Sequence, residues 1–277
     1  MNKMAIHPVL QGGPLLIAHR GGGGLMPENT LPAFLAASER WRADMIELDV
    51  RATSDGHCVV IHDATVDRTT DGTGAVNART LAELQSLDAG YRFSPDGGKT
   101  FPLRGQGVRI PTIQEVFSAL PEMRITAELK SADAQTPLFA AVQEFRATDR
   151  VIVAGERNAY RTIFHEYPGP RSASLEEAMP FFLMHRVFMA RFGRVPADVV
   201  QTCEVYRARR ILTPRLVRDF HTRGVLVHVW TVNEEADMDR LLDWGVDGLV
   251  TDRPDRLAAV LHRRIGRPLP PGLQNQA

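Results

Sequence analysis

The chain has 277 residues, of which 44% are hydrophobic and 24% charged, a composition typical of a folded globular protein rather than a disordered or fibrous one. Its 33 basic and 33 acidic residues cancel, so we expect no nucleic-acid partner and no long-range attraction to an anionic membrane. The longest apolar run, near 178–184, is far shorter than the ~18 residues of a membrane span, so no transmembrane segment is predicted. Two widely spaced cysteines and the lack of a signal-like N-terminal stretch favour a cytoplasmic location.

Short β-rich segments alternate along the chain with longer segments of helical periodicity, which is the pattern of a parallel sheet covered by helices. Strands are predicted at 15–19, 45–51, 124–130, 151–154, 171–173, 199–201, 225–230 and 248–251. Helices are predicted at 30–41, 112–120, 137–146, 158–166, 175–192, 214–222, 234–244 and 254–262. Eight strands alternating with eight helices predict an α/β fold, a closed TIM (β/α)8 barrel.

One polar stretch interrupts this alternation. Residues 62–110 are rich in turn sequences and contain a single short helical run, at 80–87. A structureless loop of this length is unusual in a compact domain, so we expect a small insertion subdomain after the second strand. The predicted organisation is a single catalytic domain at 1–263 that includes this insertion, followed by a proline-rich tail at 264–277.

Polar residues gather where the first two predicted strands end. The first strand ends in His19 and Arg20, followed by four glycines, and the second carries Glu47 and Asp49 two positions apart. Side chains two apart on a strand project to the same side of the sheet, so both carboxylates are expected to point inward together. The reactive end of a parallel barrel lies at the carboxyl ends of its strands, which makes these residues candidates for chemistry.

The third predicted strand shows the same spacing, with Glu128 and Lys130 two positions apart near its carboxyl end. Three buried carboxylates would repel one another, and a divalent cation with oxygen ligands resolves that repulsion. The donor set suits one Mg²⁺ or Ca²⁺ and argues against zinc. Two alternatives remain open: the acids form a metal-free ion-paired network with Arg20, Arg51 and Lys130, or they are solvated because the strands are misassigned.

A second imidazole follows the next short apolar segment, at His62. Two histidines at one rim can act as an acid/base pair near neutral pH, one taking a proton and the other giving one to a leaving oxygen. A cation and a guanidinium beside them would neutralise phosphate charge, so the set of residues suits phosphoryl chemistry on a diester. Taken alone, either histidine is more often a packed, hydrogen-bonded residue than a catalytic one.

These residues lie in runs that resemble the glycerophosphodiester phosphodiesterase family. The likeness extends over nearly the whole chain and is carried by the following motifs: Ala18-His19-Arg20-Gly21, Pro27-Glu28-Asn29-Thr30, Ile46-Glu47-Leu48-Asp49-Val50, Val60-Ile61-His62-Asp63, Asp67-Arg68-Thr69-Thr70, Arg109-Ile110-Pro111-Thr112, Glu128-Leu129-Lys130, Val229-Trp230-Thr231-Val232-Asn233 and Val246-Asp247-Gly248-Leu249-Val250-Thr251-Asp252-Arg253-Pro254. The resemblance implies a TIM barrel with a small insertion after its second strand.

The resemblance also implies a role for each candidate residue. It implies metal ligation by Glu47, Asp49 and Glu128, acid/base catalysis by His19 and His62, phosphate contacts from Arg20 and Lys130, an aromatic wall for the glycerol or alcohol group at Trp230, and support of the site by Glu28. The implied reaction is metal-dependent hydrolysis of a glycerophosphodiester to sn-glycerol 3-phosphate and an alcohol. The choice between water and the neighbouring glycerol hydroxyl as nucleophile stays open, as does the oligomeric state.

Two other functions remain in view. The strongly apolar helix predicted at 175–192 is expected to pack against the barrel. Its apolar residues are also consistent with a peripheral lipid contact, which would make the enzyme a lysophospholipase D acting on lysophospholipids. The third candidate is a catalytically silent barrel that only binds glycerophosphodiesters, because a fold alone does not establish an activity.

Overall fold

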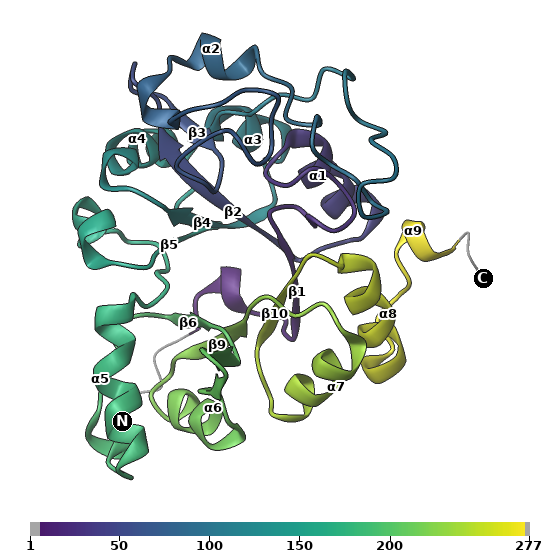
Figure 1. Ribbon diagram of the computed structural model, residues 1–277. Helices are drawn as coiled ribbons and strands as arrows, with labels where there is room; N and C mark the ends of the chain where they lie inside the picture. The colour runs from purple at the N-terminus through teal and green to yellow at the C-terminus, as the bar shows by residue number, and fades with distance from the viewer. Residues whose placement is uncertain (1–5, 275–277) are drawn as a thin grey trace.

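The computed structural model describes residues 6–274, and its centre is a ring of parallel strands surrounded by helices (Figure 1). The strands follow one another in the order β5-β4-β2-β1-β10-β9-β6. Their bounds are β1 Leu15–His19, β2 Met45–Ala52, β4 Arg124–Leu129, β5 Val151–Gly155, β6 Val199–Thr202, β9 Leu226–Val229 and β10 Gly248–Thr251. Each of these strands was predicted from the sequence, so this part of the expected fold is confirmed.

The ring is closed by the segment 171–173, which was predicted as a full strand. In the structure it forms only isolated parallel bridges, Val153 with Arg171 on one side and Ser172 with Val199 on the other. The amides of Ser172 and Ala173 donate to the carbonyls of Val153 and Val199, which joins β5 to β6. The expected α/β architecture of a TIM barrel is therefore confirmed, with its fifth strand reduced to these bridges.

The helices lie outside the strands (Figure 1). Their bounds are α1 Leu31–Leu35, α2 Leu81–Gln85, α3 Ile113–Ala119, α4 Gln135–Glu144, α5 Leu175–Arg186, α6 Pro214–His221, α7 Glu235–Asp243, α8 Pro254–Ile265 and α9 Pro271–Gln274. The helix predicted at 30–41 continues from α1 as a π-helical turn, η2 Ala36–Arg40. Thr112 and Thr213 cap α3 and α6 with their side-chain oxygens, which accept from the amides of Glu115 and Leu216.

The α-helix predicted at 158–166 is wrong. Two 3₁₀ turns, η5 Asn158–Tyr160 and η6 Thr162–Phe164, occupy the segment instead. Between them Arg161 leaves the helical region, with φ −141°. Its guanidinium is buried and bonds the carbonyl of Ser172 and the carboxylate of Glu177. The tertiary bonds of this one side chain outweigh the local helical preference.

The helix predicted at 175–192 is too long, and the expectation that it simply packs against the barrel is wrong for its second half. The helix α5 ends at Arg186, Phe188 has a positive φ of 63°, and a 3₁₀ turn, η7 Ala190–Phe192, follows. In α5 only Phe181 and His185 are buried. The apolar side chains near its end are exposed instead.

The two ends of the barrel interior differ in polarity, and this difference positions the site. The amino-terminal end is filled by one apolar cluster, to which the 3₁₀ turn η1 Pro8–Leu10 contributes; its buried members are Val9, Leu10, Leu15, Ile17, Met45, Ile152, Val199 and Val250. The inward positions nearer the carboxyl ends carry polar side chains. On β2 the inward residue is Met45 at the apolar end, and Glu47 and Asp49 follow it two and four positions later.

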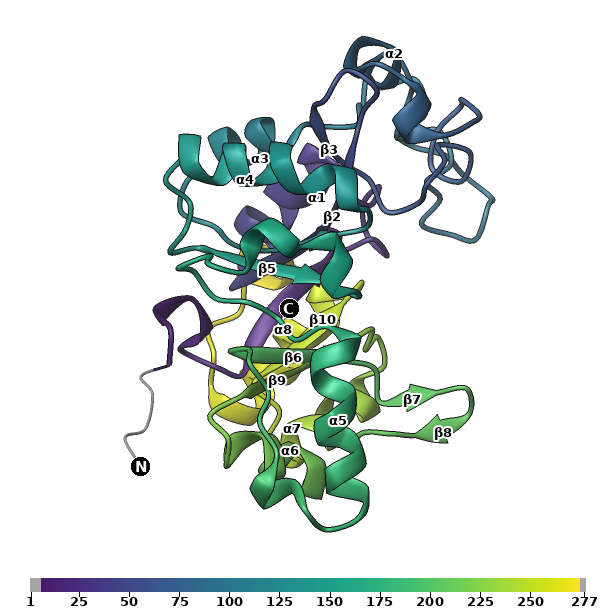
Figure 2. The same ribbon diagram turned by 90° about the vertical axis from the view of Figure 1, so that its left-hand side faces the viewer.

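The polar stretch after β2 forms a structured addition on the barrel. The strand β3 Cys58–Val60, which pairs antiparallel with β2, precedes the predicted insertion 62–110, and the insertion contains η3 Val76–Ala78 and α2. Together β3 and the insertion have their own apolar cluster, made of Val59, Ile61, Val66, Val76, Leu84, Ala89, Val108 and Ile110. Figure 2 shows α2 and the short hairpin of β7 Val205–Tyr206 and β8 Arg209–Arg210 projecting from the same side of the molecule.

The C-terminal segment does not follow the predicted tail boundary at 264. The helix α8 continues to Ile265, and Arg267 forms an ion pair with Asp44 at 2.6 Å. Residues 275–277 of the predicted tail and residues 1–5 of the predicted catalytic domain lie outside the described part of the chain. Over residues 6–274, none of the helices is both long enough and apolar enough to span a bilayer.

Candidate active site

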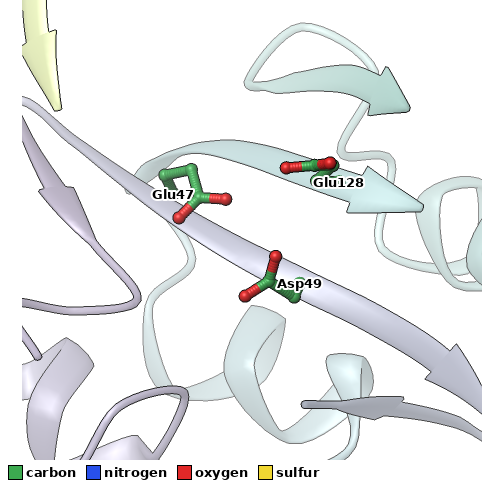
Figure 3. A group of neighbouring side chains, drawn as sticks. All are labelled: Glu47, Asp49 and Glu128. Atoms are coloured by element: carbon green, nitrogen blue, oxygen red, sulfur yellow. The ribbon is translucent and has the colours of Figure 1, made fainter. Parts of the chain in front are cut away.

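Three carboxylates meet at the carboxyl-terminal end of the barrel. Glu47 and Asp49 come from β2 and Glu128 from the neighbouring strand β4, where it pairs directly with Asp49 in the strand register. One oxygen from each carboxylate lies within 4.8 Å of the others. Figure 3 shows the three side chains facing a common point beside the two strands. The structure thus brings together the three acids that the spacing of the sequence selected.

The three carboxylates of this cluster are not equally neutralised by basic side chains. Lys130 Nζ lies 3.0 Å from Asp49 and 2.9 Å from Glu128, and Arg20 Nε lies 3.1 Å from Asp49. Although burial opposes its ionisation, these two cations lower the pKa of Asp49 below its usual value. Burial, reinforced by the charge of Asp49, raises the pKa of Glu47 to about 8. Glu47 is therefore the carboxylate that most lacks a positive partner.

This donor set fits a divalent cation. All the converging ligand atoms are carboxylate oxygens, which hard ions such as Mg²⁺ and Ca²⁺ prefer. A cation among them would also relieve the unfavourable ionisation of Glu47. The alternative of a metal-free network holds only in part. Arg20 and Lys130 join the acids, whereas Arg51 donates its Nε–H to the backbone carbonyl of His62 at 2.9 Å.

His19 lies at the end of β1 beside this cluster. Its Nε2 is 3.9 Å from Glu47, and its Nδ1 is 2.6 Å from Asp252, the residue that follows β10. Burial lowers the pKa of His19, but the hydrogen bond to Asp252 and the charges of Glu47 and Asp252 outweigh it and raise the pKa above its usual value. Asn233 donates to the other oxygen of Asp252 at 2.9 Å, so the orienting carboxylate is itself held in place.

His62 follows β3 and is held in the same way. Its Nδ1 lies 2.6 Å from Asp63, whose second oxygen accepts from Arg68 Nε at 2.6 Å. Arg68 also forms two hydrogen bonds of 2.7 Å with Glu28, and Glu28 accepts from Arg20 at 2.9 Å. The predicted supporting residue Glu28 therefore links the loop after β1 to the segment after β3. Burial opposes the ionisation of Glu28, but the two arginines outweigh it and lower its pKa below the usual value.

Trp230 and the neighbouring histidine differ in environment. Trp230 directly follows β9 and is 46% exposed at the same end of the barrel as the acidic cluster. His228, which shares its face of the strand, is fully buried, and burial lowers its pKa to about 4. The structure thus places Trp230 at the rim and His228 in the barrel interior.

A cavity with a volume of about 430 Å³ opens beside the acids. Its lining includes Glu128 and Lys130 of the cluster together with His62, Glu156 and Tyr160. A space of this size beside an imidazole and a carboxylate is large enough for a small polar substrate.

Sequence reasoning missed the residues that orient the candidate catalytic groups. These are Asp252 and Asp63 beside the two imidazoles, Arg68 beside Glu28, and Asn29, whose amide donates to Asp49 at 2.9 Å. All four stand inside the motifs that carried the resemblance, so their position was visible. Their partners were not, because the pairing of His19 with Asp252 spans 233 positions of the sequence.

Comparison with known proteins gives one consistent result. The family model described as "Glycerophosphoryl diester phosphodiesterase family" matches residues 19–256. A glycerophosphodiester phosphodiesterase of Caldanaerobacter subterraneus subsp. tengcongensis is 36% identical to the chain over 259 residues, which covers 90% of this chain and 98% of the relative. The family model therefore covers most of the chain, from the last residue of β1 to the start of α8.

Solved structures agree with this assignment. A glycerophosphodiester phosphodiesterase from Agrobacterium tumefaciens superposes with a TM-score of 0.70 at 27% identity and covers 88% of this chain and 99% of its own. An Oleispira antarctica phosphodiesterase solved in complex with the product sn-glycerol-3-phosphate shares the fold, with a TM-score of 0.72, 24% identity and coverage of 90% and 96%. This chain belongs to the glycerophosphoryl diester phosphodiesterase family of enzymes.

Proposed function

We propose that the chain hydrolyses glycerophosphodiesters to sn-glycerol 3-phosphate and an alcohol, using a divalent cation and two histidines. The observation that carries the proposal is the pairing of each imidazole, His19 and His62, with its own carboxylate at the edge of a cluster of three further carboxylates. The product bound to the Oleispira antarctica relative supports this choice of product.

The two histidines suit the roles of general acid and general base. Each Nδ1 lies 2.6 Å from a carboxylate oxygen, of Asp252 for His19 and of Asp63 for His62. Each ring therefore donates its Nδ1–H to that carboxylate, and its Nε2 is the nitrogen available for proton transfer. This arrangement is the general form of an oriented acid/base residue. The pair serves both attack by water and attack by the glycerol hydroxyl, since each route requires one proton to be taken and one to be given.

The remaining candidates bind and orient the substrate. Glu47, Asp49 and Glu128 would hold Mg²⁺ or Ca²⁺, which when bound supplies charge neutralisation for the phosphoryl oxygens. Arg20 and Lys130 lie beside Asp49 and would add their positive charges to that of the cation at the substrate phosphate. Trp230 offers an exposed apolar face to the glycerol or alcohol group, and Glu28 keeps the guanidinium of Arg20 in place.

Chelation tests the proposal directly. Treatment with EDTA is expected to abolish turnover of glycerophosphocholine, and added Mg²⁺ or Ca²⁺ is expected to restore it. The release of sn-glycerol 3-phosphate and choline is measured. Turnover that is indifferent to chelation would contradict the metal site, and binding of the diester without turnover in the presence of either cation would leave a silent binding protein.

Substitution of the histidines tests their roles separately. We expect His19→Ala and His62→Ala each to lower kcat by about 10²–10⁴ while the fold survives, because each change removes one proton-transfer group. The exposed His165 supplies a matched control, and His165→Ala is expected to retain full activity. Near-normal turnover in either of the first two variants would remove that histidine from the mechanism.

A second candidate function is lysophospholipase D activity, and the exposed apolar end of α5 favours it. A single-chain lipid needs an apolar surface for its acyl chain, and a deacylated diester does not. Turnover of glycerophosphocholine and lysophosphatidylcholine can be compared side by side. The lipid version fails when only the deacylated diester reacts.

A further inference from the structure

The end of α5 and the turn η7 expose an unusual amount of apolar surface. Phe188 is 77% exposed, Val187 62% and Phe192 61%. We call these residues and their neighbours the α5 patch, which consists of Leu183, Met184, Val187, Phe188, Met189 and Phe192. Six exposed apolar side chains within ten residues differ from the isolated apolar residues that are normal on a protein surface.

The patch is a fixed part of the surface rather than a frayed end. On the inner side of α5, Phe181 packs with its ring centroid 4.7 Å from that of Phe220, and His185 Nδ1 lies 2.6 Å from Asp219 on α6. The amide of Met189 donates to the carbonyl of Met184 at 2.8 Å, which holds the turn after α5 against the helix. The apolar groups are thus presented outward by a structured element. The helix α5 lies at the left edge of the molecule in Figure 1, and in Figure 2 it faces the viewer, in front of the barrel.

The segment that carries the patch has charges of one sign. Residues 178–197 contain no aspartate or glutamate, although the whole chain has as many acidic as basic residues. Within the same stretch Arg186, Arg191 and Arg194 are exposed. The guanidinium of Arg215 lies 3.9 Å from the centre of the Phe188 ring, and that of Arg191 lies 4.6 Å from the ring of Phe192. Apolar side chains and arginines therefore share one surface.

We propose that the α5 patch docks the protein on the surface of an anionic lipid bilayer, with its apolar side chains in the interface and its arginines against the headgroups. Exposed Phe, Leu and Met residues beside arginines are the composition of elements that lie in the plane of a membrane surface. Each arginine near an anionic surface adds a favourable contribution that falls off within a Debye length. The attraction is local, which is compatible with the zero net charge of the chain.

Charge complementarity also selects the membrane over a second copy of the chain. In a symmetric dimer through the α5 patch, the arginines of the two copies would face one another with no acidic residue from 178–197 to pair with them. An anionic bilayer supplies the opposite charge over its whole surface. The inference does not depend on the proposed reaction, because none of the patch residues belongs to the candidate active site.

Vesicle co-sedimentation of the full chain tests the inference. We expect binding to phosphatidylcholine vesicles rich in phosphatidylglycerol, weaker binding to pure phosphatidylcholine, and weakening by added salt. The double variant Val187→Ser with Phe188→Ser is expected to lower the partition coefficient at least about tenfold. The variant Arg191→Gln with Arg194→Gln is expected to lower it about fivefold for each arginine on the anionic vesicles only.

Two matched controls lie away from the patch. Ile265→Ser removes another well-exposed apolar side chain, and Arg146→Gln removes another exposed arginine; both are expected to bind vesicles like the unaltered protein. Turnover of a soluble diester should be unchanged in all four variants, which shows that they fold. Absence of vesicle binding, or equal binding by the patch variants, overturns the inference. A dimer that dissociates on Phe188→Ser without any vesicle binding assigns the patch to a second copy instead.

Discussion

At the scale of single residues, Asp252 favours the protonated form of His19. The 2.6 Å hydrogen bond and the charge of Asp252 raise the pKa of His19 against the opposing effect of burial. Asp252→Asn keeps the shape of the side chain but removes the charge and turns a strong acceptor into a weak one. We therefore expect the pKa of His19 to fall, the limb of the pH–rate profile that it governs to move to lower pH, and kcat to drop by about tenfold or more.

A pH–rate profile of kcat/KM distinguishes this positioning role from general destabilisation. The matched control is Asp219→Asn, which breaks a second histidine–aspartate pair of the same 2.6 Å length, with His185 on α5, outside the candidate active site. That control should leave the pH–rate profile in place. An unshifted profile in Asp252→Asn would show that Asp252 does not act through His19.

The convergence of the three candidate acids was predictable, because spacing along a strand encodes where side chains point. Glu47 and Asp49 stand two apart at the end of an apolar strand, and alternation alone places both inside the barrel. The residues that hold them were not predictable, since Asn29 reaches Asp49 from a loop and Asp252 reaches His19 from the other end of the chain. No local periodicity encodes such pairs.

At the scale of elements, the last turn of α6 is tied to the loop before β10 by a titratable pair. His221 Nε2 lies 2.7 Å from Asp247, whose same oxygen accepts from the amide of Val227 on β9. This hydrogen bond raises the pKa of His221 above its usual value. A raised histidine pKa adds stability at pH values below the unfolded pKa, and that stability is lost as the pH rises through the folded value.

We accordingly expect His221→Gln to destabilise the fold more at about pH 5.5 than at about pH 9. The difference in the free energy of unfolding between the two pH values should stay below about 1 kcal/mol, because the side chain is one-third exposed and solvent screens the pair. Urea denaturation of both proteins at each pH measures it. His165→Gln, at an exposed site, should show no such dependence. The opposite sign in His221→Gln would refute the pairing.

Elements were predictable where local signals and tertiary contacts agree. The strand expected at 45–51 and the helix expected at 214–222 appear as β2 and α6, and the side chain of Thr213 caps α6. The helix expected at 158–166 fails because the buried guanidinium of Arg161 bonds Glu177 and the carbonyl of Ser172, which requires a break in the helix. The prediction that the apolar residues at the end of α5 pack against the barrel is wrong, because a hydrophobic sequence does not itself indicate which partner covers it.

At the scale of the whole molecule, closure of the barrel assembles the site from distant parts of the chain. His19 ends β1, its partner Asp252 follows the last strand, and β1 and β10 lie side by side in the sheet. The segment after β3 is joined to the rim through Arg68 and Glu28. The sequence predicted the alternation that builds this ring but not the irregular closure at 171–173, because those residues form bridges rather than a continuous ladder.

The same closure concentrates charge, so at Glu47 the stability of the fold opposes the proposed metal-binding role. Its pKa of about 8 means that ionisation is costly when no cation is bound. At about pH 8.5 in EDTA, we expect Glu47→Gln to be more stable than the unaltered protein by about 1 kcal/mol or more, because a neutral side chain of the same shape removes the repulsion with Asp49.

Added Mg²⁺ or Ca²⁺ should reverse that order. Binding to the folded state alone raises the free energy of unfolding of the unaltered protein in proportion to the logarithm of cation concentration, whereas Glu47→Gln would lack one of the proposed ligands and should gain little. Urea denaturation with and without the cation measures both effects, alongside turnover. The control Glu128→Gln should gain less stability in EDTA, since Lys130 already lies 2.9 Å from that carboxylate. If the cation stabilises Glu47→Gln as much as the unaltered protein, the ion binds elsewhere. The reason is that Glu47, with its pKa of about 8, is the proposed ligand whose ionisation depends most on a bound cation.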